Sequence, residues 1–109
     1  MKELVIDLDF MIGPIMKDVY DTERNELCTG IKVVDSDQKL AKMNDEIQAE
    51  FSALYEFDQE EAVTFDLKQA REKKEDMLVK VQELLQYLNS INDGSFIVVD
   101  RATEYLKQL

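Results

Sequence analysis

The sequence predicts an α+β fold: a small antiparallel sheet of three or four short strands packs on a long antiparallel helical hairpin, and a short C-terminal helix follows. Two observations support this prediction. Apolar and polar residues alternate over the first third of the chain, and from residue 36 the apolar residues recur at intervals of three and four. The length of 109 residues, with 45% hydrophobic and 34% charged residues, is typical of one globular domain. Residues 1–109 are therefore expected to form a single domain.

Residues 1–34 are expected to form strands and a β-hairpin. Apolar side chains alternate with mostly acidic ones along residues 3–10, which is the pattern of a half-buried strand. A bend at Gly13-Pro14 leads to two further alternating segments, at residues 15–20 and 27–34, which are separated by a polar run. These two segments are predicted to pair as a hairpin with a longish loop.

Two long helices are expected next, at residues 36–57 and about 60–91. The stripe of the first helix consists of residues spaced by three and four, namely Leu40, Met43, Ile47, Phe51 and Leu54. Asp35 can cap this helix, and Gln38 can reach back to the cap. Asp58 and Asp66 can each start a capping box, so the break between the helices is placed between them.

The second long helix carries a heptad seam, as found in coiled coils and helical bundles. The seam consists of Leu67, Ala70, Lys74, Met77, Val81, Leu84, Leu88 and Ile91. Lys74 is its one polar member and is interpreted as lying at the solvated end of the hairpin. The short apolar strand expected at residues 96–100 is interpreted as central or covered on both faces. An amphipathic helix is expected at residues 101–109.

Composition and charge disfavour several function classes. The net charge of −11 opposes direct binding to nucleic acid or to an anionic membrane, and the longest apolar stretch is too short to span a bilayer. With no histidine, the chain lacks His-based triads and zinc sites. We predict no catalytic residue, metal site or cofactor. The single cysteine, Cys28, favours a reducing, cytoplasmic location.

The acidic residues concentrate in one part of the sequence. Seven carboxylates with no Lys or Arg among them follow one another there, namely Asp45, Glu46, Glu50, Glu56, Asp58, Glu60 and Glu61. Such a surface can steer and position a basic partner, or it can simply keep the protein in solution. The leading hypothesis is a non-enzymatic protein-interaction module, an adaptor, inhibitor or assembly factor, that binds a basic protein through this acidic face.

Two alternatives remain open from the sequence. The chain could be a self-associating structural or assembly component of a larger particle, for example of a phage or another mobile element. It could also be a metal-dependent enzyme that uses Asp7 and Asp9, which lie two residues apart in the first predicted strand. A homodimer is expected in addition, because the two long helices would extend beyond a small sheet and leave apolar surface uncovered.

Overall fold

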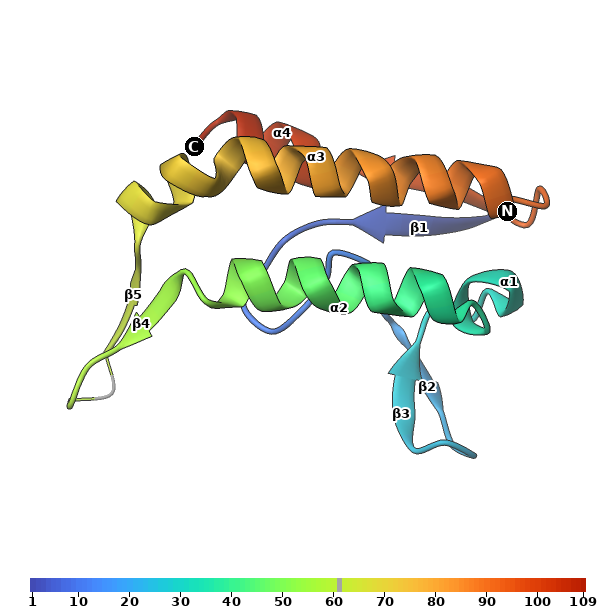
Figure 1. The fold of residues 1–109 in the computed structure, drawn as a ribbon. Coiled ribbons are helices and arrows are strands. Elements are labelled where there is room, and N and C mark those ends of the chain that lie inside the picture. Colours follow the sequence, from blue (N-terminus) through green and yellow to red (C-terminus); the bar gives the residue numbers. More distant parts are fainter. Residues whose placement is uncertain (61) are drawn as a thin grey trace.

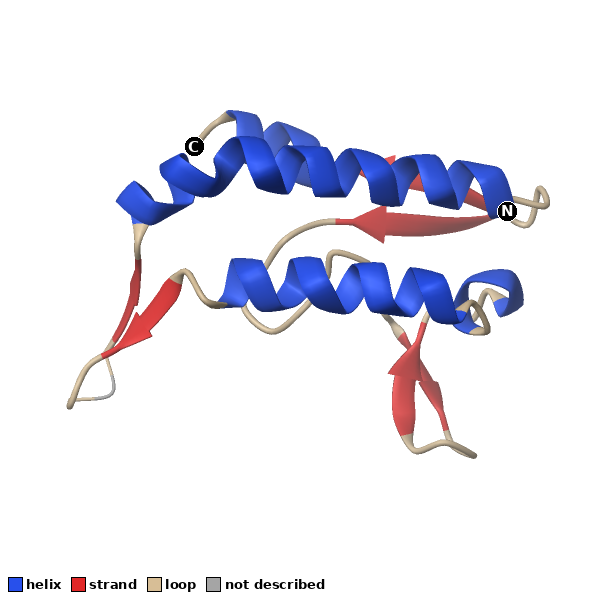
Figure 2. Ribbon diagram, viewed as in Figure 1, coloured by secondary structure: helices blue, strands red, loops and turns tan. Residues whose placement is uncertain are grey.

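The computed structural model describes residues 1–60 and 62–109, and shows a mixed α+β protein (Figures 1 and 2). The helices in these residues are α1 (Lys32–Asp35), α2 (Gln38–Ser52), α3 (Leu67–Ile91) and α4 (Ala102–Lys107). The strands are β1 (Lys2–Ile6), β2 (Val19–Asp21), β3 (Glu26–Cys28), β4 (Tyr55–Phe57), β5 (Val63–Phe65) and β6 (Phe96–Asp100). None of the helices in the described part of the chain has the length and apolar character that a membrane crossing requires.

The strands form three separate pairs, so the predicted antiparallel sheet of three or four strands is wrong. β1 pairs with β6 in parallel, whereas β2 with β3 and β4 with β5 form antiparallel hairpins. Both hairpins extend away from α3 on the same side of the molecule; β4–β5 lies beyond the C-terminal end of α2, and β2–β3 lies near its N-terminal half (Figure 1). The connection between β1 and β6 contains α1, α2 and α3. A connection of this length allows the two strands to pair in parallel.

The core lies where the β1–β6 pair meets the helices. α2 and α3 lie side by side and run in opposite directions (Figure 1). Their buried faces follow most of the predicted stripes, although Leu67 of the α3 seam is 42% exposed, and Leu4 and Ile6 of β1 join them. The largest fully buried side chains are Phe51, Phe96, Leu4, Ile6, Leu40, Ile47, Leu54, Met77, Leu84, Leu88, Leu106 and Val81. A continuous apolar core therefore joins elements from both ends of the chain.

The first strand is shorter than predicted, because the chain folds back on it. β1 ends at Ile6, and the Asp7 N–H then donates to Pro14 O at 2.9 Å. Gly13 allows this return: its φ is +79°, and a Cβ there would lie 2.2 Å from Asp7 O. Asp7 and Asp9 therefore lie in a connection after β1, and not on one face of a strand.

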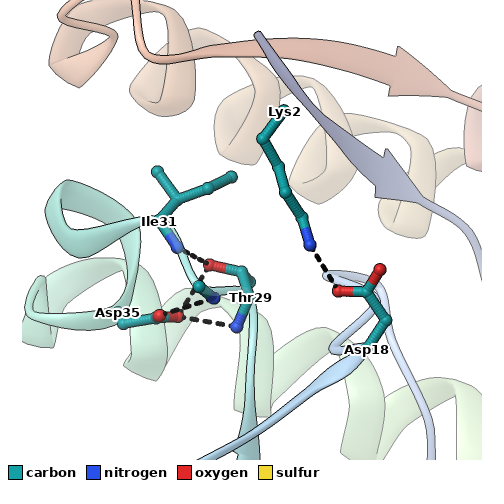
Figure 3. Close-up of polar contacts among 6 residues, drawn as sticks. Lys2, Asp18, Thr29, Ile31 and Asp35 are labelled. Atoms are coloured by element: carbon teal, nitrogen blue, oxygen red, sulfur yellow. Dashed lines mark hydrogen bonds and ion pairs between the residues drawn. The ribbon is translucent and has the colours of Figure 1, made fainter.

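The predicted strand at residues 27–34 is also corrected. β3 ends at Cys28, and Lys32–Asp35 form the short helix α1. The reason is the carboxylate of Asp35, which accepts hydrogen bonds from Thr29 N at 3.0 Å, Thr29 Oγ1 at 2.8 Å and Gly30 N at 3.0 Å (Figure 3). These bonds hold a tight turn in a segment whose β-branched residues favour a strand.

The first long helix is shorter at both ends than the expected 36–57, and the second begins later than the expected residue 60 but ends at Ile91 as expected. α2 begins after Asp37, whose side chain accepts a bond from Leu40 N at 2.9 Å, and it ends at Ser52. α3 begins after Asp66, which caps it by accepting from Gln69 N at 3.0 Å. The hairpin β4–β5 thus connects the two helices. The sequence pattern instead predicts helix up to residue 57 and a short break before the next helix.

Lys74 is half-buried in the first half of α3, and its hydrogen bond lies at the exposed surface. Its Nζ donates to Lys107 O at 3.0 Å, which joins α3 to the last turn of α4. The negative end of a short helix is a favourable place for such a cation. β6 spans the range 96–100 named from the sequence, and α4 covers part of the range 101–109.

Candidate functional site

The structure distributes the predicted acidic residues over α2 and the hairpin that follows it. Asp45 and Glu46 are exposed on α2, and Glu56, Asp58 and Glu60 are exposed on β4 and the turn after it. Glu61 lies outside the described residues. Glu50 differs from the others because it contacts α3.

Glu50 is engaged by a lysine of the neighbouring helix. Its carboxylate forms an ion pair with Lys80, which also lies 3.3 Å from Asp76. The hydrogen bond that Lys80 donates to the Glu50 carboxylate raises the pKa of the Lys80 ammonium, and its bond to Asp76 adds to this effect. The contact joins residues 30 positions apart, so no local sequence pattern indicates it. Glu50 therefore holds α2 against α3 and contributes less free negative charge than the sequence suggested.

The hairpin β4–β5, with the described residues of its turn, is called the acidic arm below. Its register pairs Tyr55 with Phe65, Glu56 with Thr64, and Phe57 with Val63. Since successive side chains in a strand point to opposite faces, the arm has one apolar face and one polar face. The apolar face consists of Tyr55, Phe57, Val63 and Phe65.

An aromatic cluster fixes the base of the acidic arm to the core. The rings of Tyr55 and Phe65 lie 5.0 Å apart between centroids, and each lies 5.8 Å from the ring of the buried Phe51. Phe10 packs on the same face, 5.0 Å from Tyr55 and 5.4 Å from Phe57. Burial raises the pKa of the Tyr55 hydroxyl, and the charge of Asp9 raises it further. The base of the arm is thus held by packing, while its outer part extends away.

The outer part of the arm combines exposed apolar side chains with uncompensated acids. Phe57 and Val63 are 58% and 53% exposed. The Asp58 carboxylate accepts from Glu60 N at 2.9 Å and Ala62 N at 2.8 Å, so it shapes the turn. The sequence contains no Lys or Arg between residues 42 and 68. The arm therefore presents an aromatic and an aliphatic side chain on one face, with acidic residues on the opposite face and in the turn.

The other hairpin, β2–β3, carries charges of both signs. Arg24 Nε lies 3.9 Å from Asp21, and Lys2 of β1 pairs with Asp18 at 2.8 Å just before β2 (Figure 3). A cavity of about 320 Å³ lies between this hairpin, α1 and α2. The buried Asn44 at its wall accepts a hydrogen bond from Ile15 N at 2.8 Å. This hairpin lacks the single-sign character of the acidic arm.

Asp7 and Asp9 each bond to the backbone of the following residue. Asp7 accepts from Leu8 N at 2.8 Å, and Asp9 accepts from Phe10 N at 2.7 Å. Within residues 1–60 and 62–109, no three side chains of His, Cys, Asp or Glu are grouped so that they could hold a metal ion.

Sequence reasoning missed the acidic arm, although a pattern for it exists. Tyr55-Glu56-Phe57 and Val63-Thr64-Phe65 both alternate apolar and polar residues on either side of a polar run, as hairpin strands do. Two plausible helix caps in the same region hid this pattern. Comparisons of the chain with protein-family models, curated proteins and solved structures find no match.

Proposed function

We propose that the protein is a small acidic interaction module, an adaptor, inhibitor or assembly factor, and that it binds a basic protein through the acidic arm. The observation that supports this most directly is the composition of the arm, in which exposed Phe57 and Val63 share one face, Glu56 lies on the opposite face, and Asp58 and Glu60 follow in the turn. Aromatic side chains contribute strongly to the energy of protein interfaces, and complementary charge directs and orients the partner. The arm provides both on a base that packing holds in place.

The charge pattern selects the chemistry of the partner. Asp45 and Glu46 on α2 add to the negative field near the arm, whereas Glu50 is neutralised by Lys80. A partner with Arg and Lys side chains around an apolar depression fits this surface, since the basic groups pair with the acids and the depression receives Phe57. The proposed binding surface therefore lies mainly on the hairpin β4–β5, and less on the face of α2.

Self-association as a component of a larger particle is the second candidate function. The observation that favours it is the outer edge of β6, with which no second strand pairs within residues 1–60 and 62–109. The two functions use different surfaces, so a variant of one surface leaves the other intact.

A charge-matched pair of variants tests the proposed binding. Glu56→Gln with Glu60→Gln removes two charges from the arm, and Glu72→Gln with Glu83→Gln removes two exposed charges from α3. Asp58 is kept because its carboxylate forms the turn. Affinity capture from the native cell, followed by mass spectrometry, compares both with the wild-type chain.

We expect the arm variant to lose basic proteins that the α3 variant and the wild type retain. Binding of these proteins to the wild type should also weaken as the salt concentration rises, because salt screens exposed charges. Circular dichroism checks that both variants remain folded. If both variants capture the same basic proteins as the wild type, the acidic arm is not the binding surface.

A further inference from the structure

We infer that β6 is a self-association surface, on which a second copy of this chain adds its own β6 in antiparallel orientation and joins the two β1–β6 pairs into one continuous sheet. This inference concerns β6 and does not depend on the acidic arm. In Figure 1, β6 lies behind α3, away from both hairpins. The two surfaces can therefore be tested separately.

The outer edge of β6 consists of the backbone groups of Phe96, Val98 and Asp100, and of these the Phe96 carbonyl accepts a hydrogen bond from Asn92 Nδ2 at 3.1 Å. Ile6 lies opposite Asp100 in the parallel register, and Arg101 N donates to Ile6 O at 2.8 Å. Since alternate residues of a strand direct their backbone groups to the same side, the N–H and C=O groups of Val98 and Asp100 face away from β1. In the described part of the chain, no other strand pairs with this edge. The edge is open to a further strand.

The side chains of β6 do not protect this edge. Natural proteins guard open edges with lysines, prolines or bulges, and the segment Phe96-Ile-Val-Val99 has none of them. Ile97 is 48% exposed on the sheet face opposite the buried Phe96. Parallel strands are normally covered on both faces, whereas this pair has the helical core on one face only. Within the described residues β6 pairs with β1 alone, so the prediction that this strand is central or covered on both faces is not met in the single chain.

The charges at the two ends of β6 favour a second copy in antiparallel orientation. Asp93 lies just before the strand and Arg101 just after it, and both are exposed. Asp100 is held by Thr103, with bonds of 3.1 Å to its N and 2.6 Å to its Oγ1. An antiparallel copy places the start of one β6 beside the end of the other, so Arg101 of each chain approaches Asp93 of the second chain. The arrangement is self-complementary, as a two-fold interface requires.

The surroundings of β6 allow two chains of like charge to approach. Residues 66–109 carry seven basic and eight acidic side chains, so nearly all of the net charge of −11 lies in the first part of the chain. A shallow hollow beside the strand is lined by uncharged residues, among them Leu85 and Asn89 of α3 together with Ile97 and Val98. Repulsion is therefore weakest on the face where the strand edge is open.

Sedimentation equilibrium over a concentration series tests the inference with two lysine variants of matched exposure. Ile97→Lys places a charge beside the proposed two-fold axis, whereas Val63→Lys, at a site 53% exposed, places one on the acidic arm. We expect the wild type and Val63→Lys to reach twice the 12.7 kDa monomer mass. Ile97→Lys should raise the dimer dissociation constant at least about tenfold, while circular dichroism shows an unchanged fold. A monomeric wild type, or equal behaviour of the two variants, would overturn the inference.

A charge exchange tests the orientation of the strands. Arg101→Glu alone and Asp93→Lys alone should each weaken the dimer, because each places like charges side by side. The double variant Asp93→Lys/Arg101→Glu should recover it. If both single variants weaken the dimer and the double variant weakens it further, antiparallel pairing through β6 is wrong. Ile97→Lys should still capture the basic partners of the acidic arm, which separates this inference from the proposed function.

Discussion

Replacement of Asp35 by alanine should destabilise the protein more than replacement of any other exposed or half-buried acid on α1 or α2. The Asp35 carboxylate accepts three hydrogen bonds, from Thr29 N, Thr29 Oγ1 and Gly30 N. Thr29 is 1% exposed, so water cannot replace the lost acceptor there, whereas Gly30 is exposed and can bond to water. Two buried donors would therefore lose their partner.

The size of the effect follows from these two donors. A buried donor left without a partner costs about 1 to 3 kcal/mol, so Asp35→Ala should lower the free energy of unfolding by about 2 to 6 kcal/mol. Asp45, which is exposed on α2, provides the control. Asp45→Ala should change stability by less than about 0.5 kcal/mol.

Urea denaturation followed by circular dichroism measures both variants. The transition midpoint of Asp35→Ala should fall while the slope stays near that of the wild type, since the surface exposed on unfolding is nearly unchanged. Equal midpoints for Asp35→Ala and Asp45→Ala would show that the turn at Thr29 does not depend on this carboxylate. The Asp35 carboxylate would then not be the reason why β3 ends at Cys28 and α1 follows.

Two further predictions concern the helices. Leu84→Ala should lower the free energy of unfolding by about 2 to 5 kcal/mol in urea denaturation, because Leu84 is fully buried; an unchanged midpoint would contradict its place in the core. Hydrogen bonds from the Leu40 N–H and the Tyr87 hydroxyl lower the pKa of Asp37 below its ordinary value of 3.8. The ionised Asp37 carboxylate therefore stabilises the fold fully above pH 3.8, and this stabilisation is lost as the pH falls through the lowered pKa. Asp37→Ala should therefore be less stable than the wild type at pH 7 by about 0.5 to 2 kcal/mol, with a difference that shrinks below pH 3.8, and a pH-independent difference would contradict it.

The buried faces of α2 and α3 and the strand β6 were predictable from the sequence, because each depends on residues close to one another in the chain. The spacing of Leu40, Ile47 and Phe51 identifies the buried face of α2, and that of Met77 and Leu84 identifies the buried face of α3. The apolar segment 96–100 likewise identifies β6. Such patterns depend only on neighbours within one element.

The pairing of the strands was not predictable in the same way. β1 and β6 are adjacent in space although most of the sequence lies between them. Nothing in the sequence of either segment indicates that the other is its partner, or that the two strands run in parallel. The turn at Thr29 depends on a side chain six residues later, and it overrides the strand propensity of Ile31 and Val33.

The sequence predicts which acidic residues belong to the candidate site, but it does not predict that several of them lie on a hairpin. The sequence identifies the acidic residues from Asp45 onwards, yet it assigns Glu56 to a helix and Asp58 to a helix cap. The structure places both on a hairpin. Lys80, which neutralises Glu50, comes from a different helix and could not be found from local spacing.

Photo-crosslinking from the arm tests the proposed binding most directly. A benzophenone amino acid replaces Phe57 in one variant and Val79 of α3 in another, at sites that are 58% and 56% exposed. In the native cell extract, the probe at position 57 should crosslink to a basic protein, in a yield that falls as salt is added, and the probe at position 79 should not crosslink to that protein. Equal crosslinking of the same protein from both positions, or crosslinks at position 57 only to proteins without basic surfaces, would contradict the proposal.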